Sequence, residues 1–115
     1  MASLINPNMK FYELYINVVH NSSKDDKNHY MYYENENAKD FLERVKNNRV
    51  GNNLQNNCVA TTTLWLVNGN DFIGSCNIRH NLNEKLLKYG GNIGYIINET
   101  FRNKGYGTLI LKLAL

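Results

Sequence analysis

Two apolar, β-branched runs joined by a short polar tetrapeptide occupy the middle of the sequence. Residues 61–67 and 72–79 flank Asn68-Gly69-Asn70-Asp71, and an Asn-Gly pair between such runs is typical of a tight hairpin turn. The sequence therefore predicts two antiparallel strands at this point. A hairpin of this kind excludes an all-helical fold.

A helical pattern comes before the hairpin, near the N-terminus. Apolar residues recur at the spacing of one helix face from Pro7 to near His20. Asn6 is the expected cap of a first turn that begins at proline. The polar stretch 21–28 that follows is predicted to be a connection without regular structure.

A second helical pattern covers residues 38–45. Asn37 is its expected cap, and Asp40 occupies the third helical position, where a carboxylate suits the first turn. Residues 47–57 are predicted to form the loop that leads to the hairpin.

The C-terminal part adds a strand and a helix. Residues 92–98 predict a strand with Ile93, Tyr95 and Ile97 on one face, preceded by a short helical turn over 83–88. A helix is predicted from Tyr106 onward. The expected order is therefore helix, helix, strand, strand, strand, helix.

Length and charge limit the class of protein. The chain has 115 residues and is expected to form one domain, 1–115. Its net charge of +3 comes from 13 basic and 10 acidic residues, and no basic run exceeds a pair, so we expect no nucleic-acid partner. No segment is long and apolar enough to cross a bilayer, and no membrane partner is expected.

The cysteines and histidines indicate neither a metal nor a disulfide framework. Cys58 and Cys76 lack the paired spacing of zinc or redox sites, which favours reduced thiols and a cytoplasmic location. The three histidines share no ligand spacing with them, so no metal site is expected.

The segment from Tyr95 to Thr108 carries the chemistry. A strand passes through a short turn into a helix whose start contains Gly105 and Gly107. The first amides of a helix have no intrahelical acceptor, and glycine lets an anion approach them closely. With Arg102 beside them, these amides predict a phosphate or pyrophosphate site; the alternative is simply a tight strand-to-helix turn.

This segment resembles motif A of the GNAT family of N-acetyltransferases, in which Arg or Gln is followed by two residues, Gly, one residue, and Gly or Ala. Arg102, Gly105 and Gly107 fill that pattern without a gap. Residues 78–95 are also similar to the hairpin-to-fourth-strand region of a bacterial subgroup of uncharacterised acetyltransferases. The resemblance implies an α/β (α+β) fold with a mixed, mainly antiparallel sheet flanked by helices.

The resemblance also implies the ligand and its residues. Acetyl-CoA would be the cosubstrate, with its pyrophosphate on the amides of the turn and its pantetheine arm along the strand. A backbone amide at or near Ile97 would meet the thioester carbonyl, and a small-molecule or peptide amine would be the acetyl acceptor. The expected cofactor-binding residues are Tyr95, Ile97, Arg102, Asn103, Lys104, Gly105, Tyr106, Gly107 and Thr108.

The catalytic groups are less well indicated. Glu99, at the end of the last strand, is the candidate for taking the proton of an acceptor amine, directly or through water; the alternative is a solvated turn residue. His80 and Glu84 are further candidates for lining the acceptor site.

The family domain continues beyond its motif A helix with strands and a helix that carries the usual tyrosine proton donor. The sequence ends at Leu115, so a C-terminally truncated domain with slow or absent acetyl transfer is expected. A non-catalytic module that binds CoA or another phosphate ligand and acts through protein contacts is the alternative.

The same reasoning predicts self-association. The strand 92–98 and the apolar helix 109–115 would each lack a cover, and a two-fold contact between two copies could bury both. We therefore expect a homodimer through the C-terminal third, with Leu111 and Leu115 among its buried positions.

Overall fold

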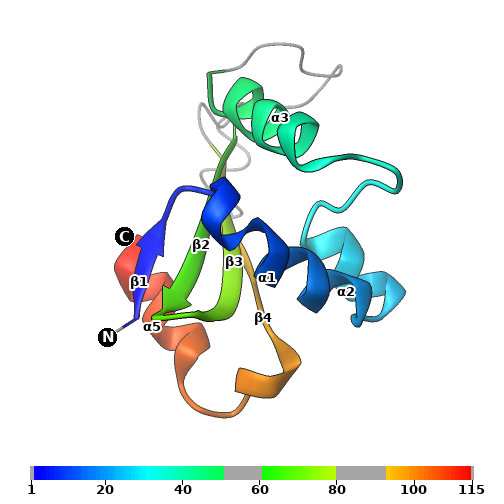
Figure 1. The fold of residues 1–115 in the computed structure, drawn as a ribbon. Helices are drawn as coiled ribbons and strands as arrows, with labels where there is room; N and C mark the ends of the chain where they lie inside the picture. The colour runs from blue at the N-terminus through cyan, green and yellow to red at the C-terminus, as the bar shows by residue number, and fades with distance from the viewer. Residues whose placement is uncertain (1, 51–60, 80–92, 115) are drawn as a thin grey trace.

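A four-stranded sheet forms the centre of the computed structural model, which describes residues 2–50, 61–79 and 93–114. The strands are β1 (Ser3–Ile5), β2 (Thr61–Asn68), β3 (Asp71–Arg79) and β4 (Ile93–Ile97). They lie in the order β1-β2-β3-β4 (Figure 1), and each neighbouring pair is antiparallel. The predicted α/β class with a mainly antiparallel sheet and flanking helices is confirmed.

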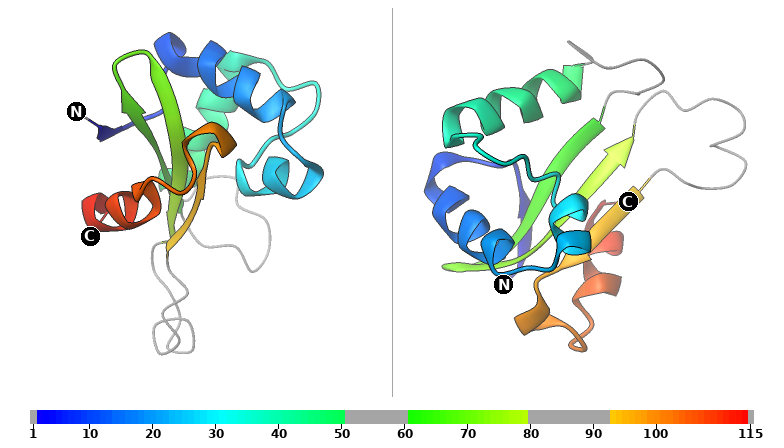
Figure 2. Two further views of the ribbon diagram at one scale, coloured as in Figure 1. Left: turned by 90° about the horizontal axis from the view of Figure 1, so that it is seen from below. Right: turned by 90° about the vertical axis from the view of Figure 1, so that its right-hand side faces the viewer.

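Helices cover both faces of this sheet. The described helices are α1 (Met9–His20), α2 (Lys24–His29), α3 (Ala38–Val50), the short 3-10 helix η1 (Glu99–Phe101) and α5 (Tyr106–Ala114). Seen along the sheet, α1, α2 and α3 lie on one side and α5 lies on the other (Figure 2, left). Over the described ranges, no helix combines the length and the apolar character that a membrane span requires.

An aromatic core fills the space between the sheet and the N-terminal helices. The ring of Tyr15 from α1 stacks on Trp65 of β2 with a centroid distance of 4.8 Å, and on Phe41 of α3 at 4.9 Å. The Tyr15 hydroxyl donates a hydrogen bond of 3.0 Å to the carbonyl of Tyr30, at the end of α2. One side chain thus joins three helices and the sheet.

A second, smaller core lies between the sheet and α5. Its buried members come from β2, β3, β4 and α5: Leu66, Ile73, Cys76, Ile97 and Ile110. Adjacent strand residues belong to different cores, with Ile96 in the aromatic core and Ile97 in the smaller one. Strand β4 is therefore covered on both faces at its C-terminal end, where the glycine-containing turn begins.

The predicted hairpin is confirmed. Asn68 pairs with Asp71, which leaves Gly69 and Asn70 as a two-residue turn, and Gly69 has a φ of 61°. Positive φ at the first central position is the geometry that glycine favours in a hairpin turn. The register shifts between Leu66 and Val67.

The two N-terminal helices were predicted with wrong limits. The first begins at Met9, and its cap is Asn8, whose side-chain oxygen accepts from the amide of Phe11 at 3.1 Å; Pro7 and Asn6 lie before the helix. The second extends to Val50 rather than Val45. Its predicted cap is confirmed, because the Asn37 side chain accepts from the amide of Asp40 at 2.8 Å.

Two elements were not predicted. The three residues of β1 form a strand because they pair with β2, with Ser3 opposite Val67 and Ile5 opposite Trp65. Helix α2 lies in the stretch that was expected to be irregular; it has no buried residue and is capped by Ser23, whose hydroxyl accepts from the amide of Asp26. The order predicted from sequence is corrected accordingly.

The C-terminal strand and helix are confirmed as β4 and α5. The predicted helical turn over 83–88 lies outside the described residues, as does the part of the predicted loop that follows Val50.

Candidate functional site

Asn98 fixes the end of β4. Its backbone amide donates to the carbonyl of Ile73 at 2.7 Å, and its side-chain amide donates to the carbonyl of Phe72 at 3.0 Å. Its side-chain oxygen accepts from the amide of Thr100 at 3.3 Å and so starts η1. Because β3 holds this asparagine from two sides, the chain leaves the sheet at a defined point.

The turn after η1 requires left-handed backbone at two positions. Asn103 has a φ of 66° and Gly105 a φ of 83°, a region that asparagine tolerates and glycine enters without cost. The carbonyl of Gly105 accepts from the amide of Leu109 at 3.1 Å, which begins α5. The amides of Tyr106, Gly107 and Thr108 therefore belong to the open first turn, at the positive end of the helix dipole.

Gly107 lies under the ring of Tyr95. A Cβ placed at position 107 would stand 3.1 Å from the Tyr95 hydroxyl oxygen and 3.2 Å from a ring carbon. Tyr95 itself is 42% exposed. The glycine therefore allows the β4 tyrosine to lie against the start of α5.

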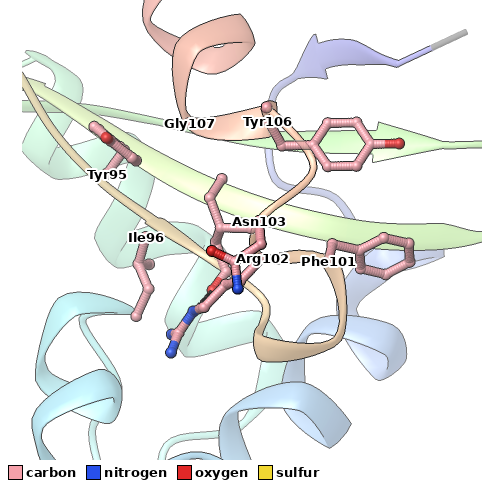
Figure 3. Close-up of a pocket in the computed structure, with 9 residues that line it drawn as sticks. Tyr95, Ile96, Phe101, Arg102, Asn103, Tyr106 and Gly107 are labelled. Atoms are coloured by element: carbon pink, nitrogen blue, oxygen red, sulfur yellow. Dashed lines mark hydrogen bonds between the residues drawn. The ribbon is translucent and has the colours of Figure 1, made fainter.

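A cavity of about 380 Å³ opens between the end of β4 and the start of α5 (Figure 3). Seven of the residues predicted to bind the cofactor line it: Tyr95, Ile97, Arg102, Asn103, Gly105, Tyr106 and Gly107. Ile96 and Phe101 complete the lining; neither was predicted, although both are apolar neighbours of predicted residues. The cavity is thus built from one continuous segment of 13 residues, 95–107.

Lys104 and Thr108 were predicted in the same set and are not part of the cavity lining. The Lys104 ammonium lies over the ring of Phe101, 5.7 Å from its centroid. The Phe101 ring in turn meets Tyr106 edge to face at 6.0 Å. The exposed Lys104 side chain therefore lies beside the cavity, on its aromatic side.

Arg102 lines the cavity, but its guanidinium already has partners. Nε donates to the carbonyl of Ile97 at 2.9 Å, and Nη2 pairs with Oδ2 of Asp26 at 3.0 Å. In Figure 3 its side chain extends away from Gly107. The sequence gave no signal for this ion pair, because its members are 76 residues apart.

Glu99, the predicted catalytic carboxylate, lies at a different hollow. Its neighbours there are Asn98 and Thr100 from the same turn and the end of α1, Asn17 to Ser22, around a volume of about 240 Å³. The carboxylate is exposed. His80 and Glu84, the other acceptor-site candidates, lie outside the described residues.

Two aromatic residues that a pocket might have used are structural. Trp65 and Tyr30 are buried in the aromatic core at 0% and 2% exposure. The Tyr30 hydroxyl has no hydrogen-bond partner among the described residues, and burial raises the pKa of this phenol well above its usual range. The same described residues contain no group of three or more histidine, cysteine or acidic side chains placed to hold a metal.

Comparison with known proteins gives one match. The family model described as "Acetyltransferase (GNAT) domain" matches residues 13–115, which include α1, the hairpin, β4, the turn and α5. No curated protein and no solved structure matches the chain significantly.

Proposed function

Because the chain belongs to the GNAT acetyltransferase family, we propose that it binds acetyl-CoA at the junction of β4 and α5 and transfers the acetyl group to a primary amine. The observation that supports this most is the cavity between Tyr95 and Gly107, where seven predicted residues meet. Acetyl-CoA is a common metabolite of the cytoplasm, which is where we propose that the protein acts.

The pyrophosphate of CoA would lie at the open first turn of α5. Three consecutive amides, from Tyr106 to Thr108, are available there, and the dipole of the nine-residue helix favours a negative charge at its N-terminus. Lys104 is exposed beside this turn and would add positive charge. The pantetheine arm would follow the edge of β4, past the exposed ring of Tyr95.

Acetyl transfer needs a neutral amine and a polarised thioester carbonyl. The amine nitrogen would form a bond to the carbonyl carbon while the carbon–sulfur bond breaks, and the departing thiolate would take up a proton. We propose that a backbone amide at or near Ile97 donates to the carbonyl oxygen, as resemblance to the family implies. That amide belongs to β4, whose end is held by Asn98.

The acceptor would enter by the hollow that contains Glu99. This hollow adjoins the end of β4 through Asn98, and its lining contains one carboxylate and no basic side chain. An amine that arrives as an ammonium ion would meet the Glu99 carboxylate together with amide and hydroxyl groups. Glu99 is proposed to take the proton that this ammonium must lose before it attacks.

The experiment is a thiol-release assay with acetyl-CoA and a panel of primary amines, paired with calorimetry of CoA binding. We expect CoA to bind and thiol release to depend on the added amine. A turnover of about 1 per second or more would indicate a complete site, whereas a lower rate would match the expectation that this chain alone transfers slowly.

The Glu99→Gln variant tests the proposed base. It should bind CoA as the wild type does and lose turnover with the amine that the wild type prefers. Binding of CoA without any acetyl transfer would support the alternative of a non-catalytic CoA-binding module, and absence of CoA binding would contradict the proposed function.

A further inference from the structure

Arg102 connects two parts of the fold that the chain itself does not join. Through Nε it holds the carbonyl of Ile97, the last residue of β4, and through Nη2 it holds Asp26 of α2. Both contacts are within hydrogen-bonding distance, at 2.9 and 3.0 Å. Helix α2 is thus tied by a side chain to the turn that precedes α5.

The same arginine lines the cavity at the start of α5. A dianionic or trianionic phosphate ligand in that cavity would be a second acidic partner for its guanidinium. Asp26 and such a ligand therefore compete for one side chain. The outcome depends on which partner stabilises the guanidinium more.

The Asp26 contact is the weaker of the two. The side chains of Arg102 and Asp26 are 40% and 25% exposed, and an ion pair in contact with water typically changes an equilibrium by less than about fivefold. A charge-assisted hydrogen bond from arginine to a phosphate typically contributes about tenfold or more. The phosphate should win the arginine at small cost.

Building on the proposed binding of CoA, we propose that Asp26 is a positioning residue that holds Arg102 until the pyrophosphate of CoA takes the guanidinium from it. Binding of the cofactor then breaks the link between α2 and the turn. Asp26 thereby lowers the affinity for CoA, and CoA in turn loosens α2.

Helix α2 is suited to respond in this way. It has six residues and no buried side chain, so local contacts such as the Arg102 pair make up a large share of what holds it. The carboxylate that remains is partly exposed and can be hydrated. The buried hydroxyl of Tyr30, which has no partner among the described residues, also lies within electrostatic range of both Asp26 and Arg102.

The test compares CoA affinities by calorimetry in the full chain. Asp26→Asn should bind CoA about two- to fivefold more tightly than the wild type, because the competing charge is gone. Asp25→Asn is the matched control: it makes the same change at the adjacent position of α2, on an exposed side chain, and should leave the affinity within error. Arg102→Ala should weaken binding about tenfold or more.

A double variant shows whether the effect passes through Arg102. In the Arg102→Ala background, Asp26→Asn should no longer change the affinity, since there is no arginine to release. If Asp26→Asn weakens binding or leaves it unchanged while the wild type binds CoA, the proposed exchange is wrong and the proposed function stands. If the wild type does not bind CoA, the proposed function itself is contradicted.

A measurement on the wild type avoids any variant. Hydrogen exchange of the amides of residues 24–29 should become faster when CoA is added, whereas a ligand that merely stabilises the fold would slow it. Slower or unchanged exchange in α2 at saturating CoA would overturn the exchange.

Discussion

The ring of Tyr95 rests against Gly107 so closely that a Cβ on residue 107 would lie 3.1 Å from the tyrosine hydroxyl. The two residues come from opposite sides of the cavity, one from β4 and the other from the first turn of α5. The glycine therefore has a steric reason that does not depend on any ligand. It also makes the position of Tyr95 a sensitive measure of the width of the site.

The first prediction is that Gly107→Val abolishes CoA binding. The added methyl groups would push the Tyr95 ring out of place and narrow the approach to the amides of α5, with an overpacking cost of about 1 to 3 kcal/mol. Gly94→Val is the control, because it makes the same change on β4, where a Cβ would meet nothing within 4 Å. Equal CoA affinities of Gly107→Val and wild type in calorimetry would rule out this site.

The second prediction separates backbone strain from binding. Gly105 and Gly69 both have positive φ, at 83° and 61°, and open space around a hypothetical Cβ. Alanine at either position should reduce the free energy of unfolding by about 1 to 2 kcal/mol. Urea titrations should show similar losses, whereas only Gly105→Ala should weaken CoA binding, because Gly69 lies in the hairpin turn. A similar loss of CoA affinity in Gly69→Ala would show that the effect is general destabilisation.

The elements that sequence predicted well are those whose pattern is local. The Asn-Gly turn and the apolar periodicity of α1, α3 and α5 depend on neighbours within about one turn or one hairpin. Strand β1 was missed because three residues carry too little pattern and become a strand through pairing with β2. Helix α2 was missed because it buries no apolar face.

The candidate site divides in the same way. The glycines and their neighbours could be predicted, because strand, turn and helix start follow one another in the chain, and the structure gathers them around one cavity. The partner of Arg102 could not, since it depends on how α2 packs against the end of β4. Glu99 follows β4 directly, yet its side chain lies at a separate hollow beside α1.

A third prediction concerns the pH dependence of stability. Cys76 is fully buried between β3 and α5, and burial raises the pKa of its thiol from 9.0 to about 11, against a smaller opposing effect of a hydrogen bond with the Leu64 backbone. The folded state holds this proton more tightly than the unfolded state does. The stabilisation is therefore complete below about pH 9 and is lost as the pH rises to about 11.

Urea unfolding of the wild type and of Cys76→Ala between pH 8 and pH 11 measures this effect, at roughly these settings around the thiol range. The wild type should lose more stability than the variant across the upper part of the range, by an amount on the order of 2 kcal/mol. Tyrosine ionisation contributes to both proteins alike. Parallel curves would show that the thiol does not carry the dependence.

The fourth prediction is the proposed homodimer through the C-terminal third. Leu111 packs against the chain's own smaller core, so a change there would also destabilise the monomer. Leu113 is 44% exposed on α5 and is the cleaner position to test. Light scattering at tens of micromolar should show a dimer for the wild type and a monomer for Leu113→Asp, with Lys112→Asp as the control. A monomeric wild type would contradict the proposal.

The fifth prediction tests the central claim, that CoA binds on the amides at the start of α5, and amide chemical shifts recorded during a CoA titration test it most directly. The largest changes should fall on residues 103–108 and on the end of β4, because the pyrophosphate would accept hydrogen bonds from these amides. Changes confined to other parts of the sheet or to α3, with residues 103–108 unaffected at saturation, would contradict it.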